Sequence, residues 1–575
     1  MSRPRRSPLL SLPVLLVACG DSGGGDASGT SVTTATMTQP GTDTTVTTTP
    51  PTTGPDGTGT GDASSGGAGP APTTVDDTGT KFDVPAGETG DATDSGPPVD
   101  SCKVQDNMDA VGDCEDVAPP DSFSPSLQWS FGANEQSMVT PLAGNFTDDN
   151  GDGAIDLCDI PDVILVSGPQ ISYGQICPIH VLYGATGTEH FQIPPSENIS
   201  CFSTPAFADI DSDGLPEIVA LWNSGGVFHL KAFEHDGALK WTNNSGGEGT
   251  DQFSRESGAI AIHDLDADGD AEIVFNHEVY DHDGQLLWEK PNPMAGEIEC
   301  TTAADLDGDG KLEVITGHSA YRWDGTQVFE NYPTIPGQAI PQVANLDEDP
   351  DPEIFITSGV GVWMVEHDGA IKWGPGTPTG VQPAFYTIWQ RPGTVHDFDG
   401  DGGPEMASSS QQFYAVYEGP NMADVLWQAM VVDSSGAAAG TAFDFLGDGV
   451  AEAMYADEQN LSIFDGKTGA VLLTQPRISL TISEYPTVVD VDNDGSAEIL
   501  VVSLSGQPAL QVLRDADDRW IQARRIWNQH AYYVTNVRED STLPQVPVDN
   551  WKVFNTFRTQ AQIEGGALCM PPIPG

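Results

Sequence analysis

The chain has 575 residues, and its 85 Asp and Glu residues outnumber its 22 Lys and Arg residues, which gives a formal net charge of −63 at pH 7. A charge of this size repels polyanions, so the composition excludes nucleic acid and anionic membrane surfaces as partners. After the N-terminal region, no stretch approaches the ~20 apolar residues that a membrane-spanning helix needs.

Residues 1–18 are typical of an export signal, with a basic start followed by a short apolar run. The segment Leu16–Cys19 resembles the bacterial lipoprotein box, and this resemblance implies cleavage before Cys19 and a lipid on the Cys19 sulfur. Gly20 rather than Asp follows, so the resemblance also implies an exported protein that is lipid-anchored to the bacterial outer membrane or cell surface. The alternative is an ordinary signal peptide with an incidental cysteine.

A low-complexity segment, residues 19–101, is rich in Thr, Gly and Pro. Because it has little apolar surface to bury, we expect a disordered stalk. A cysteine-containing lead-in, residues 102–124, connects this stalk to the repeats. Disulfides are expected in an exported protein. Proximity favours Cys102 with Cys114, while Cys177 can pair with either Cys158 or Cys201.

An acidic loop recurs through most of the remaining chain. In the copy Asp305–Val314, carboxylates stand at positions 1, 3, 5 and 9 and Gly at position 6, and an apolar β-type run follows. Carboxylates two residues apart in a tight loop converge on one point, and Ca²⁺ takes about six to eight oxygen ligands. Seven copies begin at intervals of 40 to 55 residues, which is the period of a repeat fold.

These loops define the candidate calcium ligands. An upstream loop of the EF-hand type contributes five of them, and a weaker copy at Asp444, Asp448 and Glu452 has Leu446 at position 3, so we expect it to bind least. The predicted metal ligands are Asp148, Asn150, Asp152, Asp156 and Asp159, then Asp209, Asp211, Asp213 and Glu217, then Asp264, Asp266, Asp268 and Glu272, then Asp305, Asp307, Asp309 and Glu313, then Asn345, Asp347, Asp349 and Glu353, then Asp397, Asp399, Asp401 and Glu405, and finally Asp490, Asp492, Asp494 and Glu498.

Each repeat otherwise has the pattern of short β-strands. Asp-Gly turns between apolar runs predict hairpins, and an aromatic residue follows the Gly after four positions in several repeats, as Trp241 follows Gly237. Four strands in each repeat predict an all-β fold, a β-propeller of eight four-stranded blades over residues 125–515, with seven blades as the alternative. The additional strand Ser126–Trp129 is expected to close the ring by joining the last blade.

The loops and their layout resemble the FG-GAP, or VCBS, repeats of integrin α-subunits, through the motif DxDxDGxxEI. The resemblance covers roughly residues 125–515. It implies that each loop joins the first two strands of a blade and binds Ca²⁺.

Residues 516–575 break the repeat and concentrate basic side chains. We expect them to form a C-terminal cap on the ring, with their cations facing the acidic blades. The alternative is a partner-binding aromatic patch at Trp527, Tyr532 and Tyr533. Residues 520–530 are compatible with a short helix.

The pattern favours a binding protein over an enzyme. Several His residues recur at one place in successive repeats, as structural residues do, and the loops account for the acidic residues. We therefore expect a monomeric cell-surface lipoprotein that binds an extracellular protein or glycan through a calcium-stabilised propeller and meets the membrane through its lipid anchor only. The alternatives are a propeller enzyme that acts on polysaccharide as a lyase or hydrolase, or a structural component of the envelope.

Overall fold

A computed structural model of the chain describes residues 112–119, 122–246, 255–291, 300–347, 349–378, 391–410, 412–418, 424–433 and 438–570. All of these residues belong to the second of the chain's two compact units, Asp77–Gly575. The predicted signal peptide, the predicted lipidation site Cys19 and the predicted stalk lie outside the described residues. Among the described residues, no helix is long and apolar enough to cross a bilayer.

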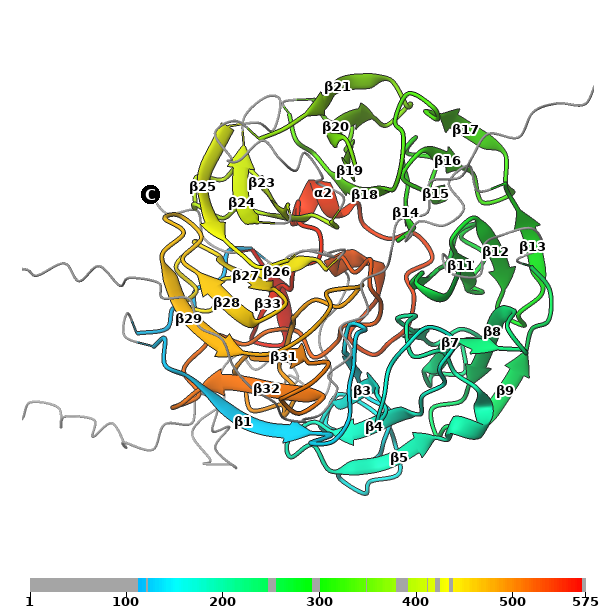
Figure 1. Ribbon diagram of the computed structural model, residues 1–575, viewed down its shortest axis with the longest axis vertical. Coiled ribbons are helices and arrows are strands. Elements are labelled where there is room, and N and C mark those ends of the chain that lie inside the picture. Colours follow the sequence, from blue (N-terminus) through cyan, green and yellow to red (C-terminus); the bar gives the residue numbers. More distant parts are fainter. Residues whose placement is uncertain are drawn as a thin grey trace, which may run out of the picture. The chain divides into compact units, whose positions relative to one another are not determined.

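Eight four-stranded antiparallel sheets form a ring of blades (Figure 1), so the predicted all-β propeller with eight blades is confirmed. The first three strands of each blade are almost wholly buried between neighbouring blades, because their side chains are apolar on both faces. Blades 1 to 4 contain β2 (Leu142–Gly144), β3 (Asp162–Val166), β4 (Ile179–Tyr183) and β5 (Glu189–Ile193); β6 (Ala206–Ala208), β7 (Glu217–Asn223), β8 (Phe228–Phe233) and β9 (Leu239–Thr242); β10 (Ile260–His263), β11 (Glu272–Phe275), β12 (Glu278–Asp281) and β13 (Leu286–Glu289); and β14 (Thr302–Ala304), β15 (Glu313–Ile315), β16 (Ser319–Tyr321) and β17 (Gln327–Glu330).

The ring closes between strands from opposite ends of the repeat region. Blade 8 takes three consecutive strands and is completed by β1 (Pro125–Phe131), which pairs with β32 along Pro125↔Asp515 to Phe131↔Leu510. The predicted closing strand is therefore confirmed. Blades 5 to 8 contain β18 (Ala339–Ala344), β19 (Glu353–Ser358), β20 (Gly361–Glu366) and β21 (Ile371–Gly376); β22 (Thr394–His396), β23 (Glu405–Ser409), β24 (Phe413–Glu418) and β25 (Asp424–Met430); β26 (Gly440–Phe443), β27 (Glu452–Ala456), β28 (Asn460–Phe464) and β29 (Val471–Pro476); and β30 (Thr487–Val489), β31 (Glu498–Val502) and β32 (Leu510–Asp515).

The hairpin Gly and the aromatic residue of the fourth strand recur in the repeats because the aromatic ring of one blade packs against the hairpin Gly of the next blade. The Trp241 indole of blade 2 donates to the His282 carbonyl of blade 3 at 2.8 Å and lies against Gly284, whose φ is +75°. A Cβ at Gly284 would lie 2.7 Å from the ring, so only Gly fits both the turn and the ring. The same contact joins Trp288 to Gly325 in the next pair of blades.

The antiparallel order of the strands gives the ring two distinct sides. We call one the acidic face; it carries the connections between the first and second strands, such as 209–216, 305–312 and 490–497. We call the other the insertion face; it carries the connections between the second and third strands, such as 167–178, and those between successive blades, such as 194–205.

The segment 519–570 crosses the ring and bonds to every blade (Figure 1). It contains η2 (Val534–Asn536), α2 (Asn550–Val553), β33 (Gln562–Glu564) and β34 (Ala567–Cys569), and the short η1 (Pro195–Glu197) lies elsewhere in the chain. Its contacts therefore hold the eight blades together at their inner ends. Each blade has at least one hydrogen bond to this segment. In order from blade 1 to blade 8, the bonded pairs are Ala143 with Trp527, Phe207 with Asn528, Ile262 with Gln529, Ala303 with Tyr533, Asn345 with Asn555, Val395 with Phe557, Phe445 with Ile521 and Asp490 with Arg524.

Two interpretations of this segment are wrong, the short helix over residues 520–530 and the alternative aromatic patch. Residues 520–530 are extended and form isolated bridges, such as Ala143↔Trp527, because their backbone bonds go to the blades and not to each other. The aromatic patch is no docking surface, since Trp527 and Tyr532 are 0 % exposed and Tyr533 is 6 % exposed. The expected pairing of cap cations with acidic blades holds for Arg519, which pairs with Asp515 of β32 at 2.8 Å, but Arg524 and Arg525 both pair with Glu539 of the same segment.

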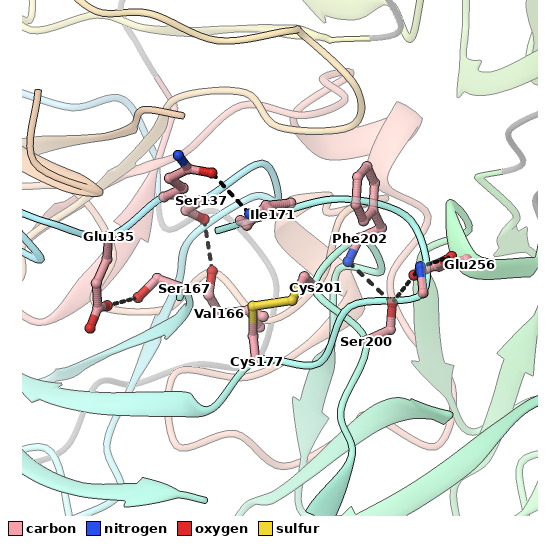
Figure 2. Close-up of a disulfide and its surroundings, with 12 residues drawn as sticks. Glu135, Ser137, Val166, Ser167, Ile171, Cys177, Ser200, Cys201, Phe202 and Glu256 are labelled. Carbon is pink, nitrogen blue, oxygen red and sulfur yellow. Dashed lines mark hydrogen bonds between the residues drawn. A yellow bond between two sulfur atoms is a disulfide. The ribbon is translucent and has the colours of Figure 1, made fainter. Parts of the chain in front are cut away.

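The disulfides differ from the pairing that proximity favoured. Cys114 is bonded to Cys569, 455 residues away, and not to Cys102. Cys177 is bonded to Cys201, which selects one of the two alternatives and joins two connections on the insertion face (Figure 2). Cys158 is also disulfide-bonded, and Cys300 is buried outside any disulfide. The lead-in and the end of the described chain are therefore covalently tied.

We predict that Trp527→Ala lowers the free energy of unfolding by about 3–5 kcal/mol, the usual cost of emptying a buried aromatic site. Trp527 stacks on Tyr532 with ring centroids 4.4 Å apart. Trp323→Ala is the matched control; its side chain is 38 % exposed, and its loss should cost about 1 kcal/mol or less. Denaturant unfolding measures both, and equal losses would contradict the bracing role of the segment.

Candidate metal centres

In every blade but the fifth, the acidic loop is shaped by the carboxylate at its first position. In blade 4, Asp305 Oδ1 accepts the N–H groups of Gly308 and Asp309 at 2.8 and 3.1 Å, and its Oδ2 accepts that of Gly310 at 2.8 Å. Gly308 and Gly310 have φ of +71° and +86°, which a side chain would resist. The first Asp thus folds the loop around its own oxygens and brings the acids at positions 3 and 5 to the same side.

The residue at position 9 is the first residue of the second strand, and its carboxylate holds the loop in place by accepting a backbone N–H from it. In blade 4, Glu313 Oε2 accepts the N–H of Leu306 at 2.9 Å, and Glu313 is 2 % exposed. The same bond recurs in blades 2 to 8 with lengths from 2.6 to 3.1 Å. The pairs are Glu217 with Ile210, Glu272 with Leu265, Glu313 with Leu306, Glu353 with Leu346, Glu405 with Phe398, Glu452 with Phe445, and Glu498 with Val491.

These bonds use one oxygen of each Glu and leave the carboxylates of a loop converging on one point. Carboxylate oxygens lie within 4.8 Å of one another in the groups Asp397, Asp399, Asp401 and Glu405; Asp209, Asp211 and Glu217; Asp213, Glu217 and Glu234; Asp264, Asp266 and Glu272; and Asp305, Asp307 and Glu313. Oxygen-only donor sets of this kind suit hard divalent cations.

The electrostatics of these groups also fit a cation. Burial, with the charges of Asp397, Asp399 and Asp401, raises the pKa of Glu405 to about 9. Burial likewise raises the pKa of Glu272 to about 8. Among the described residues, Asp266 Oδ1 and Glu498 Oε1 are buried without a hydrogen-bond partner. Crowded carboxylates with unused buried oxygens require either protons or a cation, and a divalent ion would satisfy them.

The remaining predicted ligands lie on equivalent loops. Asn345 takes the first position in blade 5, and its amide donates to the Asp349 carbonyl at 2.8 Å. Asp490 of blade 8 is 0 % exposed, and its oxygens accept the N–H groups of Asp494 and Gly495, both at 3.2 Å. The loop with Leu446 keeps the same fold, since Asp444 accepts from Gly449 at 2.7 Å.

Blade 1 departs from this pattern. Here Asp162 begins the second strand, accepts the Phe146 N–H at 3.0 Å, and so takes the place of the position-9 Glu. The predicted EF-hand-type loop is an insertion beside it; Asp148 accepts from Gly151 at 2.7 Å, and Asp159 accepts from Asp149 at 2.9 Å. The insertion also holds Asn150, Asp152 and Asp156, each of which accepts a backbone N–H two residues ahead.

Sequence reasoning missed two kinds of residue at these centres. Asp162 could have been found from its place after Pro161, which matches Pro216 before Glu217. Burial raises the pKa of Asp162 to about 8. Glu234 of blade 2, which joins the Asp213 and Glu217 group, lies outside the loop motif and carries no sequence signal.

Comparison with solved structures shows the fold. The V. cholerae biofilm matrix protein Bap1 is similar with a TM-score of 0.63 and 20% sequence identity, over 77% of this chain and 99% of Bap1. The exotype rhamnogalacturonan lyase YesX, with 17% identity over 72% of this chain and 76% of its own, has a TM-score of only 0.47. The Bacillus licheniformis rhamnogalacturonan lyase PL11, with 17% identity over 81% of each chain, also has a TM-score of 0.47.

No family model matches the chain, and no curated protein matches it significantly. The resemblances to FG-GAP repeats and to the lipoprotein box therefore stay predictions. The chain is an eight-bladed propeller with a fold similar to that of Bap1, and its acidic loops gather carboxylates that could hold metal ions.

Proposed function

We propose that this protein is an exported, lipid-anchored propeller, stabilised by Ca²⁺ in FG-GAP-type loops, that binds an extracellular protein or glycan through its insertion face. The observation that carries this proposal is the unequal use of the two faces. The segment 519–570 bonds to the acidic-face loops, as Ser541 does to Asp209 and Gln522 to Asp490. Of the fifteen large apolar side chains that are at least 40 % exposed in the described part of the chain, eight lie on insertion-face connections, and the others lie on outermost strands, in the lead-in or in the segment 519–570.

Eight large apolar side chains on insertion-face connections are at least 40 % exposed. Isolated exposed apolar residues are ordinary, but a set of them on the connecting loops of one face is typical of an interaction surface. The eight are Tyr173, Ile176, Val227, Tyr332, Val360, Val432, Ile478 and Leu480.

The region around Tyr173 is held firmly enough to present a surface. Its ring stacks on Phe202 with centroids 4.3 Å apart, and the Cys177–Cys201 disulfide joins the same two connections (Figure 2). Glu256 accepts the N–H of Gly174 at 2.7 Å and adds a third connection. An exposed aromatic ring on a braced loop suits stacking on a sugar ring or packing against a protein.

The fold similarity to a biofilm matrix protein supports an extracellular role, and the oxygen-only loops support Ca²⁺ over transition metals. When bound, Ca²⁺ would supply the positive charge that the converging carboxylates need. The loop residues hold the ion. The position-9 Glu, which also bonds to the loop N–H, connects the ion site to the second strand, so binding of the ion stabilises the blade.

The calcium component predicts a melting temperature that falls with rising pH when Ca²⁺ is absent and stays level when Ca²⁺ is bound. A raised carboxyl pKa means that the folded protein without Ca²⁺ binds protons more tightly than the unfolded chain, so its stability falls as pH rises from about 5 to about 9. At high pH, each occupied site adds about 2.7 kcal/mol when Ca²⁺ exceeds its Kd a hundredfold. Thermal melts in chelator and in Ca²⁺ at pH 5.5 and 8.5 measure this.

Glu405→Gln is the informative variant for that measurement. The amide oxygen can still accept the Phe398 N–H, and the amide is neutral in both states, so folding no longer has to take up a proton or bury a charge; the variant should melt above the wild type in chelator at pH 8.5 and respond less to Ca²⁺. Identical melts in chelator and in Ca²⁺ at both pH values would overturn the calcium component.

The lipid anchor has its own test. Cys19→Ser removes the sulfur that would carry the lipid, so the variant should move from the detergent phase to the aqueous phase on Triton X-114 partitioning of expressing cells. Cys300→Ser, which changes a buried cysteine elsewhere, should partition as the wild type. Equal membrane retention of Cys19→Ser would contradict the anchor.

The binding role predicts saturable retention without turnover. Full-length protein in Ca²⁺ is incubated with a panel of polysaccharides and extracellular proteins, and both retention and product release are assayed. Tyr173→Ala should weaken retention about tenfold, whereas Trp323→Ala, an aromatic residue of similar exposure on the acidic face, should not. Product release abolished by one substitution outside the loops would instead establish the polysaccharide enzyme.

A further inference from the structure

The outermost strand of every blade contains a β-bulge at the same place. In blade 2, Ala232 pairs with Trp241 and Phe233 pairs with Leu239, so Lys240 has no partner in register. A bulge of this kind re-aims one side chain, and here it lies just before the aromatic residue that contacts the next blade. From blade 1 to blade 8 the bulged residues are His190, Lys240, Leu287, Val328, Lys372, Leu426, Leu472 and Gln128.

In blade 2 the bulged side chain reaches into the acidic loop. Lys240 Nζ lies 2.6 Å from Asp211 Oδ2, 3.1 Å from Glu217 Oε1 and 3.2 Å from Glu234 Oε1. Asp211 and Glu217 are the loop ligands at positions 3 and 9, and Glu217 is 0 % exposed. The ammonium group therefore contacts two of the four loop carboxylates that a metal ion would need, at positions 3 and 9.

Blade 5 repeats this arrangement with different residues. Lys372 Nζ pairs with Asp347, lies 3.3 Å from Glu353 Oε1, and lies 3.0 Å from Glu366 Oε1. Asp347 and Glu353 are again positions 3 and 9 of the loop. Glu366, like Glu234 in blade 2, begins the hairpin between the third and fourth strands, where its N–H bonds to the carbonyl four residues ahead.

The other blades lack this pair of residues. The bulged residue is apolar in blades 3, 4, 6 and 7, and the hairpin position is Asp281 in blade 3, Arg322 in blade 4 and Glu418 in blade 6, which has the Glu without the Lys. Arg322 pairs with Asp307 and Asp309 at the exposed rim of its loop, and its side chain is 40 % exposed. Lys at the bulge thus coincides with Glu at the hairpin in blades 2 and 5.

We propose that the bulged residue decides whether a blade takes a metal ion, and that Lys240 and Lys372 are built-in cations that keep Ca²⁺ out of blades 2 and 5. This inference rests on the proposed calcium binding and deepens it. An ammonium group that touches the position-3 and position-9 carboxylates occupies the ligands and the space of a divalent ion, and the two charges would repel at that distance. The loop carboxylates of those two blades then have a counter-charge without a metal ion, whereas the loop carboxylates of blades with Leu or Val at the bulge need a metal ion.

The test counts bound Ca²⁺ per full-length chain by equilibrium dialysis with elemental analysis. Lys240→Leu and Lys372→Leu, which install the residue of blades 3, 6 and 7, should each add one ion, and the double variant should add two. Leu287→Lys and Leu426→Lys should each remove one. Lys240→Gln, which installs the uncharged bulge residue of blade 8, should also add one ion. This polar variant still tests the inference if the Leu variants fail to fold.

Lys552→Leu is the control, because Lys552 pairs with Asp549 of the segment 519–570 at 2.6 Å and not with a loop. Its Ca²⁺ count should equal that of the wild type. Wild-type binding with unchanged counts in the Lys240, Lys372 and Leu287 variants would overturn this inference and leave the calcium proposal standing. A wild type that binds no Ca²⁺ would overturn both.

Discussion

The bond between a buried carboxylate and a loop N–H is the constraint on which the rest of each blade depends. The carboxylate begins the second strand, so it must be buried between blades, and its bond to the second residue of the loop fixes where the loop turns. The loop's other acids are then forced to converge at the N-terminal end of that strand, on the acidic face. The raised pKa of Glu405 and the need for a counter-charge both follow from that one placement.

Much of this could be predicted from sequence because it is local. The first Asp and the Gly of each loop act within ten residues, and the Asp-Gly hairpins act within four, so their repetition revealed eight blades. The closing strand was predictable because Trp129 matches the aromatic residue of the other fourth strands. These features are encoded in short patterns that a chain repeats.

What the sequence did not reveal depends on contacts between distant segments. Lys240 reads as an ordinary strand residue until the bulge turns it toward Asp211, 29 positions away in the chain. The pairing of Cys114 with Cys569 depends on how the lead-in and the segment 519–570 meet. Trp527 and Tyr532 had the composition of a recognition patch, and only their burial in the folded ring shows that they form a core.

Closure by β1 has a consequence for how the protein is made. The pairing Pro125↔Asp515 joins residues separated by nearly the whole propeller, so blade 8 cannot form until β32 has been synthesised and delivered to the same compartment. Contacts at such separation form slowly because the chain must first lose the entropy of closing the loop. The ring is therefore completed only when β1 meets β32. Until then, the edges of β1 and β32 stay available to chaperones or to neighbouring copies.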